Sequence, residues 1–106
     1  MSAISYLRPF AFEQITVGSS STTLTAATYL DRSTEAAKAQ KAVEATITVE
    51  NNNVRWRIDG GTPDANTGHL LTAGSSITLS GGTSIVNFKA YAPTPSALLV
   101  VTYYNA

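Results

Sequence analysis

The residues best suited to chemistry are two carboxylates that bracket a turn near the middle of the chain, Asp59 and Asp64. With the help of backbone carbonyls they could hold a Ca²⁺ ion, which prefers oxygen ligands. A second interpretation needs no ion. Asp59 can bond the backbone of the Gly60-Gly61 pair, and Asp64 can cap the turn after Pro63. We favour this structural role, and the sequence predicts neither a metal site nor a cofactor.

Catalysis would require a cluster of titratable or nucleophilic groups, which the sequence does not contain. The chain has one histidine and no cysteine. His69 therefore has no His or Cys companion for metal binding or general base catalysis, and we interpret it as a surface or packing residue. The glycine pairs at 60–61 and 81–82 do not join a strand to a helix, so they do not predict a phosphate-binding loop. We predict that the chain is not an enzyme.

Trp56 and the two arginines beside it are the other candidate binding residues. Apolar and charged residues alternate over positions 54–59, which predicts a half-buried strand with Trp56 on its apolar face. A core role for Trp56 is therefore favoured over a sugar-stacking platform. Arg55 and Arg57 share the opposite face, where they could pair with glutamates of the same hairpin or bind a carboxylate on a partner.

The elements that position these residues are predicted to be strands. Positions 43–50 show the cleanest alternation in the chain, and three asparagines separate this strand from the next one. Asparagine tolerates left-handed backbone, so the two strands are expected to form a β-hairpin. Glu44 and Glu50 would then lie across from the two arginines, which stabilises each pair by up to about 1 kcal/mol.

The rest of the chain extends the same architecture. Segments rich in β-branched and aromatic residues alternate with Gly, Asn, Ser and Pro turns, and we expect further strands at 12–17, 22–30, 75–79, 84–92 and 97–104. The last strand is apolar on both faces as far as Val101, which is typical of a sheet that is covered on both sides. The predicted fold is an all-β antiparallel β-sandwich of about seven or eight short strands, either jelly-roll or Ig-like.

Two segments do not fit the strand pattern. Residues 1–12 are interpreted as an N-terminal arm, which leaves a single sandwich domain at 13–106. Residues 31–42, rich in Ala and Lys, predict one short helix or a loop insertion. The predicted partner-binding residues are Tyr6, Leu7, Arg8, Phe10, Phe12, Arg55 and Arg57, with the segment 29–41 as a second candidate. The predicted core and turn residues are Trp56, Asp59, Gly60 and Pro63.

Composition and charge exclude several classes of function. The 106 residues carry 7 Lys+Arg and 7 Asp+Glu without a run of one sign, which argues against nucleic acid as the main ligand. The N-terminal segment lacks a secretory signal pattern and no stretch reaches the length of a membrane span, so we expect synthesis in a cytoplasm. A chain of this size has a small core, and with zero net charge it is expected to form a homo-oligomer.

The C-terminal two thirds of the chain, from about position 43, resemble a known family. The pattern hydrophobic-Arg-aromatic-Arg-x-Asp-Gly-x-x-Pro occurs at 54–63 and is followed by Gly-x-Leu-Leu-x-Ala-Gly at 68–74. A strand ending in Leu79, a Phe-Lys-Ala segment at 88–90 and a closing strand at 100–104 complete the pattern. In order and spacing these elements are similar to those of a family of small phage and prophage virion proteins. Ile58 departs from the family, which often has a second acidic residue at this place.

This resemblance implies a structural role in a phage particle. Members of the family are β-rich structural proteins of tailed phages. The expected function is that of a capsid decoration (cement) protein, which would bind the major capsid protein and itself, as a dimer or trimer, and stabilise the head. The alternatives are a neck, tail or baseplate component, or a carbohydrate- or receptor-binding module of the virion. The expected location is the capsid surface of the virion, after synthesis in the host cytoplasm, with no nucleic acid or membrane partner.

Overall fold

The computed structural model describes residues 7–31 and 40–105, so the predictions for Tyr6 and for positions 32–39 lie outside it. In this part of the chain the strands are β1 (Arg8–Val17), β2 (Thr22–Thr23), β3 (Leu30–Asp31), β4 (Gln40–Lys41), β5 (Glu44–Glu50), β6 (Val54–Arg57), β7 (His69–Leu71), β8 (Ser76–Ser80), β9 (Lys89–Tyr91) and β10 (Ala97–Asn105). The helices are α1 (Ala26–Tyr29) and α2 (Gly82–Asn87).

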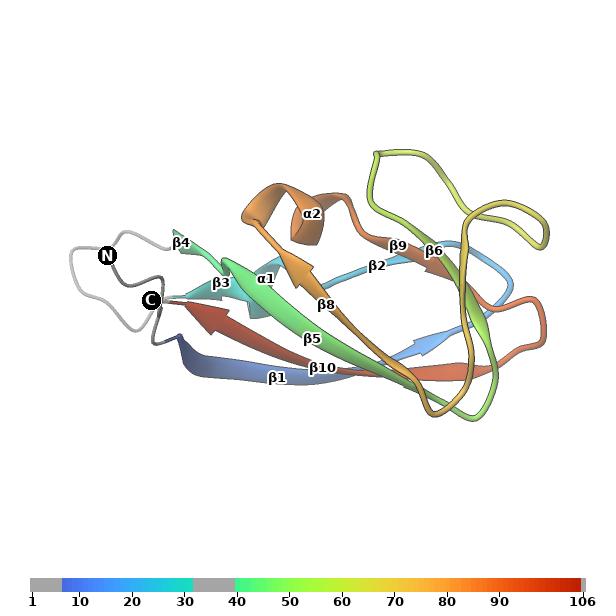
Figure 1. The fold of residues 1–106 in the computed structure, drawn as a ribbon, viewed down its shortest axis with the longest axis horizontal. Coiled ribbons are helices and arrows are strands. Elements are labelled where there is room, and N and C mark those ends of the chain that lie inside the picture. The colour runs from blue at the N-terminus through green and yellow to red at the C-terminus, as the bar shows by residue number, and fades with distance from the viewer. Residues whose placement is uncertain (1–6, 32–39, 106) are drawn as a thin grey trace.

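Eight of these strands form two antiparallel sheets (Figure 1). The first sheet has the order β1-β10-β5-β8, and the second has the order β2-β9-β6-β7. The pairings are nested, because β1 pairs with β10, β2 with β9, β5 with β8, and β6 with β7. A nested order of this kind, in two four-stranded sheets, is that of a jelly roll. The predicted all-β sandwich is confirmed, and of the two variants considered the strand order fits the jelly roll.

Strand β10 occupies the centre of the first sheet, between β1 and β5. Its odd-numbered residues from Ala97 to Asn105 are buried, and its even-numbered residues from Leu98 to Tyr104 are partly exposed. Successive side chains of a strand point to opposite faces, so the buried row faces the second sheet and the other row lies on the outer surface. The strand is apolar on both faces, as expected, but the described residues cover only the inner one.

The core lies between the two sheets and collects residues from nearly every element. Its largest fully buried side chains are Tyr103, Phe88, Ile47, Ile85, Leu99, Val17, Val49, Val54 and Val101. Trp56 is half-buried and packs against this core, as its register predicted. Pro63 is also fully buried, which anchors the long loop between β6 and β7 to the sandwich. Burial of large apolar side chains supplies about 1.5–3 kcal/mol each and is the main stabilising contribution.

The prediction that the strands at 43–50 and 54–59 form a β-hairpin is wrong. β5 pairs with β10 and β8 in the first sheet, whereas β6 pairs with β7 and β9 in the second. The three asparagines between them, with Asn51 at φ 78°, carry the chain from one sheet to the other. Glu44 and Glu50 therefore do not lie across from the arginines. The alternation of apolar and polar residues correctly predicted both strands. Their pairing partners, however, are set by long-range packing, because Ala45, Ile47 and Val49 are buried when β5 lies beside β10.

The boundary predicted after Phe12 also needs correction, because it falls inside a strand. β1 pairs with β10 over its whole length, so residues 8–12 belong to the sandwich and not to an arm. The absence of a clean pattern there has a local cause, a register shift between Pro9 and Ala11 that interrupts the alternation. Pro9 is tolerated because β1 is an edge strand.

Two of the predicted strands contain helical turns. The segment 22–30 is divided among β2, α1 and the start of β3, and the segment 84–92 begins within α2 before it enters β9. Contrary to the sequence interpretation, the glycine pair at 81–82 does join a strand to a helix, since it connects β8 to α2. Gly81 has a φ of 92°, which favours glycine, and the short helix buries Ile85 while Val86 stays exposed. Asp31, the first residue of the segment predicted as a short helix or loop, lies in β3 and is buried.

Two polar contacts engage the buried side chains of Asp31 and Tyr103. Asp31 is 1% exposed, and its Oδ2 accepts hydrogen bonds from Nη2 of Arg8 at 2.6 Å and Nδ2 of Asn105 at 3.1 Å. The hydroxyl of Tyr103 donates to Oε2 of Glu13 at 2.5 Å. Burial of Tyr103, together with this bond, raises the pKa of its hydroxyl well above the usual range. Both contacts satisfy polar groups whose burial would otherwise be costly.

We expect the Arg8→Ala variant to lose about 2–3 kcal/mol of unfolding free energy, because it removes the guanidinium that pairs with the buried Asp31 carboxylate at 2.6 Å. The loss should fall short of the roughly 3–5 kcal/mol typical of fully buried pairs, since the Arg8 side chain is 42% exposed. Urea unfolding measures the difference. Lys41→Ala, at an exposed cation of β4, is the matched control and should stay within about 0.5 kcal/mol. Equal effects of the two variants would contradict this role of Arg8.

Candidate functional site

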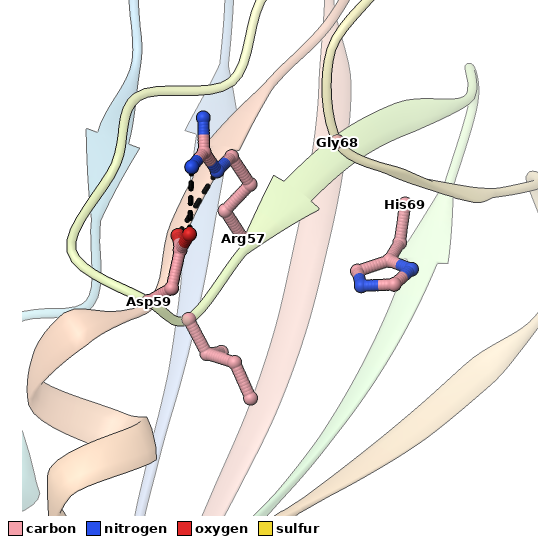
Figure 2. Close-up of a pocket in the computed structure, with 5 residues that line it drawn as sticks. Arg57, Asp59, Gly68 and His69 are labelled. Atoms are coloured by element: carbon pink, nitrogen blue, oxygen red, sulfur yellow. Dashed lines mark hydrogen bonds and ion pairs between the residues drawn. The ribbon is translucent and has the colours of Figure 1, made fainter.

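The central stretch singled out in the sequence forms a hollow of about 360 Å³ beside the second sheet (Figure 2). Its lining residues are Arg57, Ile58, Asp59, Gly68 and His69. β6 ends at Arg57, the chain turns through Asp59 and Gly60, where φ is 89°, and it returns at Gly68 to begin β7. Gly68 has φ 121° and an added Cβ would lie 3.1 Å from the carbonyl oxygen of Trp56, so both its conformation and its position require glycine.

Arg57 and Asp59 form a two-point ion pair within this hollow. Nε of Arg57 donates to Oδ1 of Asp59 at 2.9 Å, and Nη2 donates to Oδ2 at 2.6 Å. The backbone N–H of Gly61 donates to Oδ1 at 3.1 Å, as the sequence predicted for this turn. A Cβ on Gly61 would lie 2.3 Å from Cζ of Arg57, so any larger residue here would displace the guanidinium. The pair is therefore internal to the turn, and Arg57 does not reach Glu44 or Glu50.

The pair also fixes the charge of both groups. The hydrogen bonds from Arg57 and from the Gly61 N–H lower the pKa of Asp59 to about 2. The same contact raises the pKa of Arg57. The pKa of Asp64 is lowered as well, chiefly by the N–H of Asn66. Because these carboxylates stay ionised well below neutral pH, neither has the pKa of a general acid or base.

His69 contacts an aromatic ring and not the ion pair. Its ring centroid lies 4.7 Å from that of Trp56, and Figure 2 shows the imidazole set apart from Arg57 and Asp59. Trp56 in turn stacks on Phe88 at a centroid distance of 6.0 Å. His69 is thus an exposed residue that packs on Trp56, which agrees with its interpretation as a surface or packing residue. Because the half-buried Trp56 ring already contacts two other rings, it does not offer the exposed platform that sugar stacking requires.

The carboxylates considered for a Ca²⁺ site are engaged in local turns. Oδ1 of Asp64 accepts the N–H of Asn66 at 2.9 Å, and the backbones of Asp64 and Thr67 form a bridge. Within residues 7–31 and 40–105 no three His, Cys, Asp or Glu side chains come close enough together to hold a metal ion. The turn bonding that we favoured over an ion is thus observed at both aspartates.

The predicted partner-binding residues are not brought to one place. Arg8 points inward to Asp31, and Phe10 packs against the core. Leu7 is half-buried ahead of β1. Phe12, by contrast, is 59% exposed. Its register partner is Thr102, which belongs to the outer row of β10, so Phe12 lies on the outer surface of the first sheet.

Sequence reasoning did not single out the neighbours of Phe12 on this surface. We call it the outer face, and it is formed by Phe12, Gln14, Thr46, Thr48, Leu98, Val100, Thr102 and Tyr104. The apolar character of both faces of the last strand was the available signal. It could not identify Phe12 as part of the same surface, because that requires the pairing of β1 with β10, strands separated by most of the chain.

Arg55 lies on the same side of β6 as Arg57 but enters a different hollow. Its Nη1 donates to the carbonyl of Gly68 at 3.2 Å. Its strand neighbours are Leu70 on β7 and Tyr91 on β9. The glutamate partners considered for it in the sequence are in the other sheet, and no carboxylate of the described residues pairs with it.

Neither described helix has the length and apolar character needed to cross a membrane. Comparisons with protein-family models, curated proteins and solved structures find no significant match to this chain.

The Arg57→Gln variant should raise the pKa of Asp59 from about 2 toward the ordinary value of about 3.9. A carboxyl whose folded pKa lies below its unfolded pKa contributes stability above the unfolded value, and this contribution is lost as the pH falls through the folded pKa. The variant should therefore show less acid-dependent loss of stability below about pH 4. Carboxyl ¹³C titration by NMR measures the shift, which should be larger at Asp59 than at Asp64, because Arg57 lowers the pKa of Asp64 only as the smallest of several causes. An unchanged Asp59 titration would contradict the assigned pair.

Proposed function

We propose that this chain is a non-enzymatic structural protein of a bacteriophage virion, a decoration protein that binds the outside of the capsid and stabilises the head. The sequence resemblance suggests the class of particle. The jelly roll is compatible with it, because viral capsid proteins use this architecture, although lectins and cupins use it too. The single observation that carries the proposal is the outer face of the first sheet, which the described residues leave uncovered.

The outer face has the chemistry of a protein-docking surface. It presents Phe12 and the apolar residues of β10, and β5 adds Thr46 and Thr48. The charged residues on this side are Glu44 and Glu50, at the two ends of β5. An apolar centre with a polar rim is typical of specific interfaces. The complementary capsid surface would have an apolar centre and basic residues at its margin.

Stabilisation would follow from linkage. A protein that binds the assembled shell, and not its dissociated subunits, shifts the equilibrium toward the shell by about 2.7 kcal/mol per site when its free concentration is about 100 times Kd. Many identical copies on one particle make a modest affinity at each site effective. Self-association as a dimer or trimer stays part of the proposal, and light scattering of the purified protein tests it.

A place in the neck, tail or baseplate is the alternative within the same class, and the outer face would serve there equally well. The number of copies per virion distinguishes the two. A carbohydrate-binding module based on Trp56 or on the Tyr103-Tyr104 pair is less favoured. Trp56 is covered by other rings, and the two tyrosines point to opposite faces, with Tyr103 buried.

Quantitative staining of purified virions tests the proposal. A decoration protein should be present in numbers comparable to the capsid subunits, and heads stripped of it by mild heating should become fragile. A copy number comparable to one ring of tail proteins, retained on detached tails, would move the chain to the neck or tail. Absence from the virion would overturn the proposal.

Two serine substitutions on opposite sides of the sandwich locate the contact. Phe12→Ser should raise the Kd for rebinding to stripped heads by about 10-fold to 100-fold, because it removes the free energy gained by burying one large apolar side chain. Leu70→Ser is the matched control, since Leu70 is similarly exposed, at 51%, but lies on the second sheet. It should leave Kd unchanged. Equal effects of the two variants would contradict docking through the outer face.

A further inference from the structure

A second hollow, of about 390 Å³, lies on the opposite side of the sandwich from the outer face. Arg55 and Leu70 are neighbours on its floor, and both alternate with the buried residues Val54 and Leu71, so they point away from the core. The hollow is lined by Asn51, Asn52, Asn53, Arg55, Ala65, Leu70, Ala73, Pro93 and Thr94. The loops that follow β5, β7 and β9 meet at one end of the fold (Figure 1), and the loop after β6 adds Ala65 to the lining.

The guanidinium of Arg55 is incompletely bonded. Nη1 donates to the carbonyl of Gly68, but Nε is buried without a hydrogen-bond acceptor among the described residues. Arg57 uses its Nε and Nη2 together to hold the carboxylate of Asp59. Nε and Nη2 of Arg55 do not bind any carboxylate of the described residues. A buried donor without a partner costs roughly 1–3 kcal/mol, which calls for an explanation in a native fold.

The other polar groups of the hollow define what a ligand must offer besides negative charge. Nδ2 of Asn52 donates to the carbonyl of Ser96, and Oδ1 of Asn53 accepts the N–H of Ala73. These bonds orient two of the amides and leave Oδ1 of Asn52 as an acceptor and Nδ2 of Asn53 as a donor. Asn51 adds another amide and Thr94 a hydroxyl. A carboxylate alone can only accept hydrogen bonds, so these amide oxygens match a ligand that also carries hydroxyl groups.

We propose that this hollow binds an acidic sugar unit, with its carboxylate on Arg55 and its hydroxyls on the asparagine amides. Leu70 and Pro93 supply the apolar walls that such sites use against a sugar ring. Arg55 is the charged residue of the lining, and no carboxylate there opposes an anion. The inference goes beyond a capsid role and does not depend on it. A chain docked through the outer face would keep this hollow turned to the medium.

The experiment is an NMR titration of the folded protein with glucuronate, observed at the arginine Nε–H resonances. Because Nε of Arg55 is buried, carboxylate binding requires its guanidinium to turn toward the hollow. Saturable shifts at Arg55 and at the side-chain amides of 51–53, with Arg57 unmoved, are expected. Glucose, which has the hydroxyls without the carboxylate, should bind about tenfold or more weakly.

Two variants and a second acid complete the test. Arg55→Gln should lower glucuronate affinity about tenfold or more, while Arg57→Gln, which removes an equal charge two residues away, should leave it within about twofold. Thermal unfolding checks that both variants are folded. Equal binding of N-acetylglutamate would overturn the sugar assignment and point to an acidic side chain of a partner protein. Absence of saturable shifts with glucuronate would overturn the proposal, whatever the outcome of the virion experiments.

Discussion

The structure depends on the strict alternation of β10. Leu99, Val101 and Tyr103 fill the layer between the sheets, and β1 and β5 pair with the two edges of the same strand. In the nested order of strand pairs, the outermost pair is β1 with β10, which brings the two ends of the described chain together. Its register constrains how the inner strand pairs can form. A one-residue slip here would turn every core side chain of the strand to the outside. In a chain of 106 residues, one apolar layer has to supply most of the stability.

The same alternation produces the functional surfaces. Because β10 is apolar on both faces, closing the core leaves a second apolar row on the outer face, which no described element covers. The second sheet has a different outer side, where the arginines of β6 enter two separate hollows. Arg57 is satisfied within its own turn, whereas the buried Nε of Arg55 has no acceptor among the described residues. One sandwich thus presents an outer face with an apolar row along β10 on one side and a polar, cationic hollow on the other.

The sequence was informative where local chemistry decides the outcome. The alternation at 43–50 and 54–57, the turn bonding of Asp59 and the core register of Trp56 follow from neighbouring residues, and the structure contains them. Pairing partners do not follow in this way. The strands β5 and β6 are adjacent in sequence but separate into different sheets, and Phe12 reaches the outer face only through a partner about ninety residues away. The unsatisfied Nε of Arg55 could not be predicted either, because it depends on which sheet the glutamates join.

Hydroxyl-radical footprinting of the protein, free and bound to phage heads, tests the central claim most directly, since it reports side-chain exposure residue by residue. Docking through the outer face predicts that Phe12 and Tyr104 lose reactivity on the head, while Leu70 and Tyr91, on the second sheet, keep it. Protection of Leu70 and Tyr91 with Phe12 still reactive would place the contact on the opposite side of the sandwich and contradict the account.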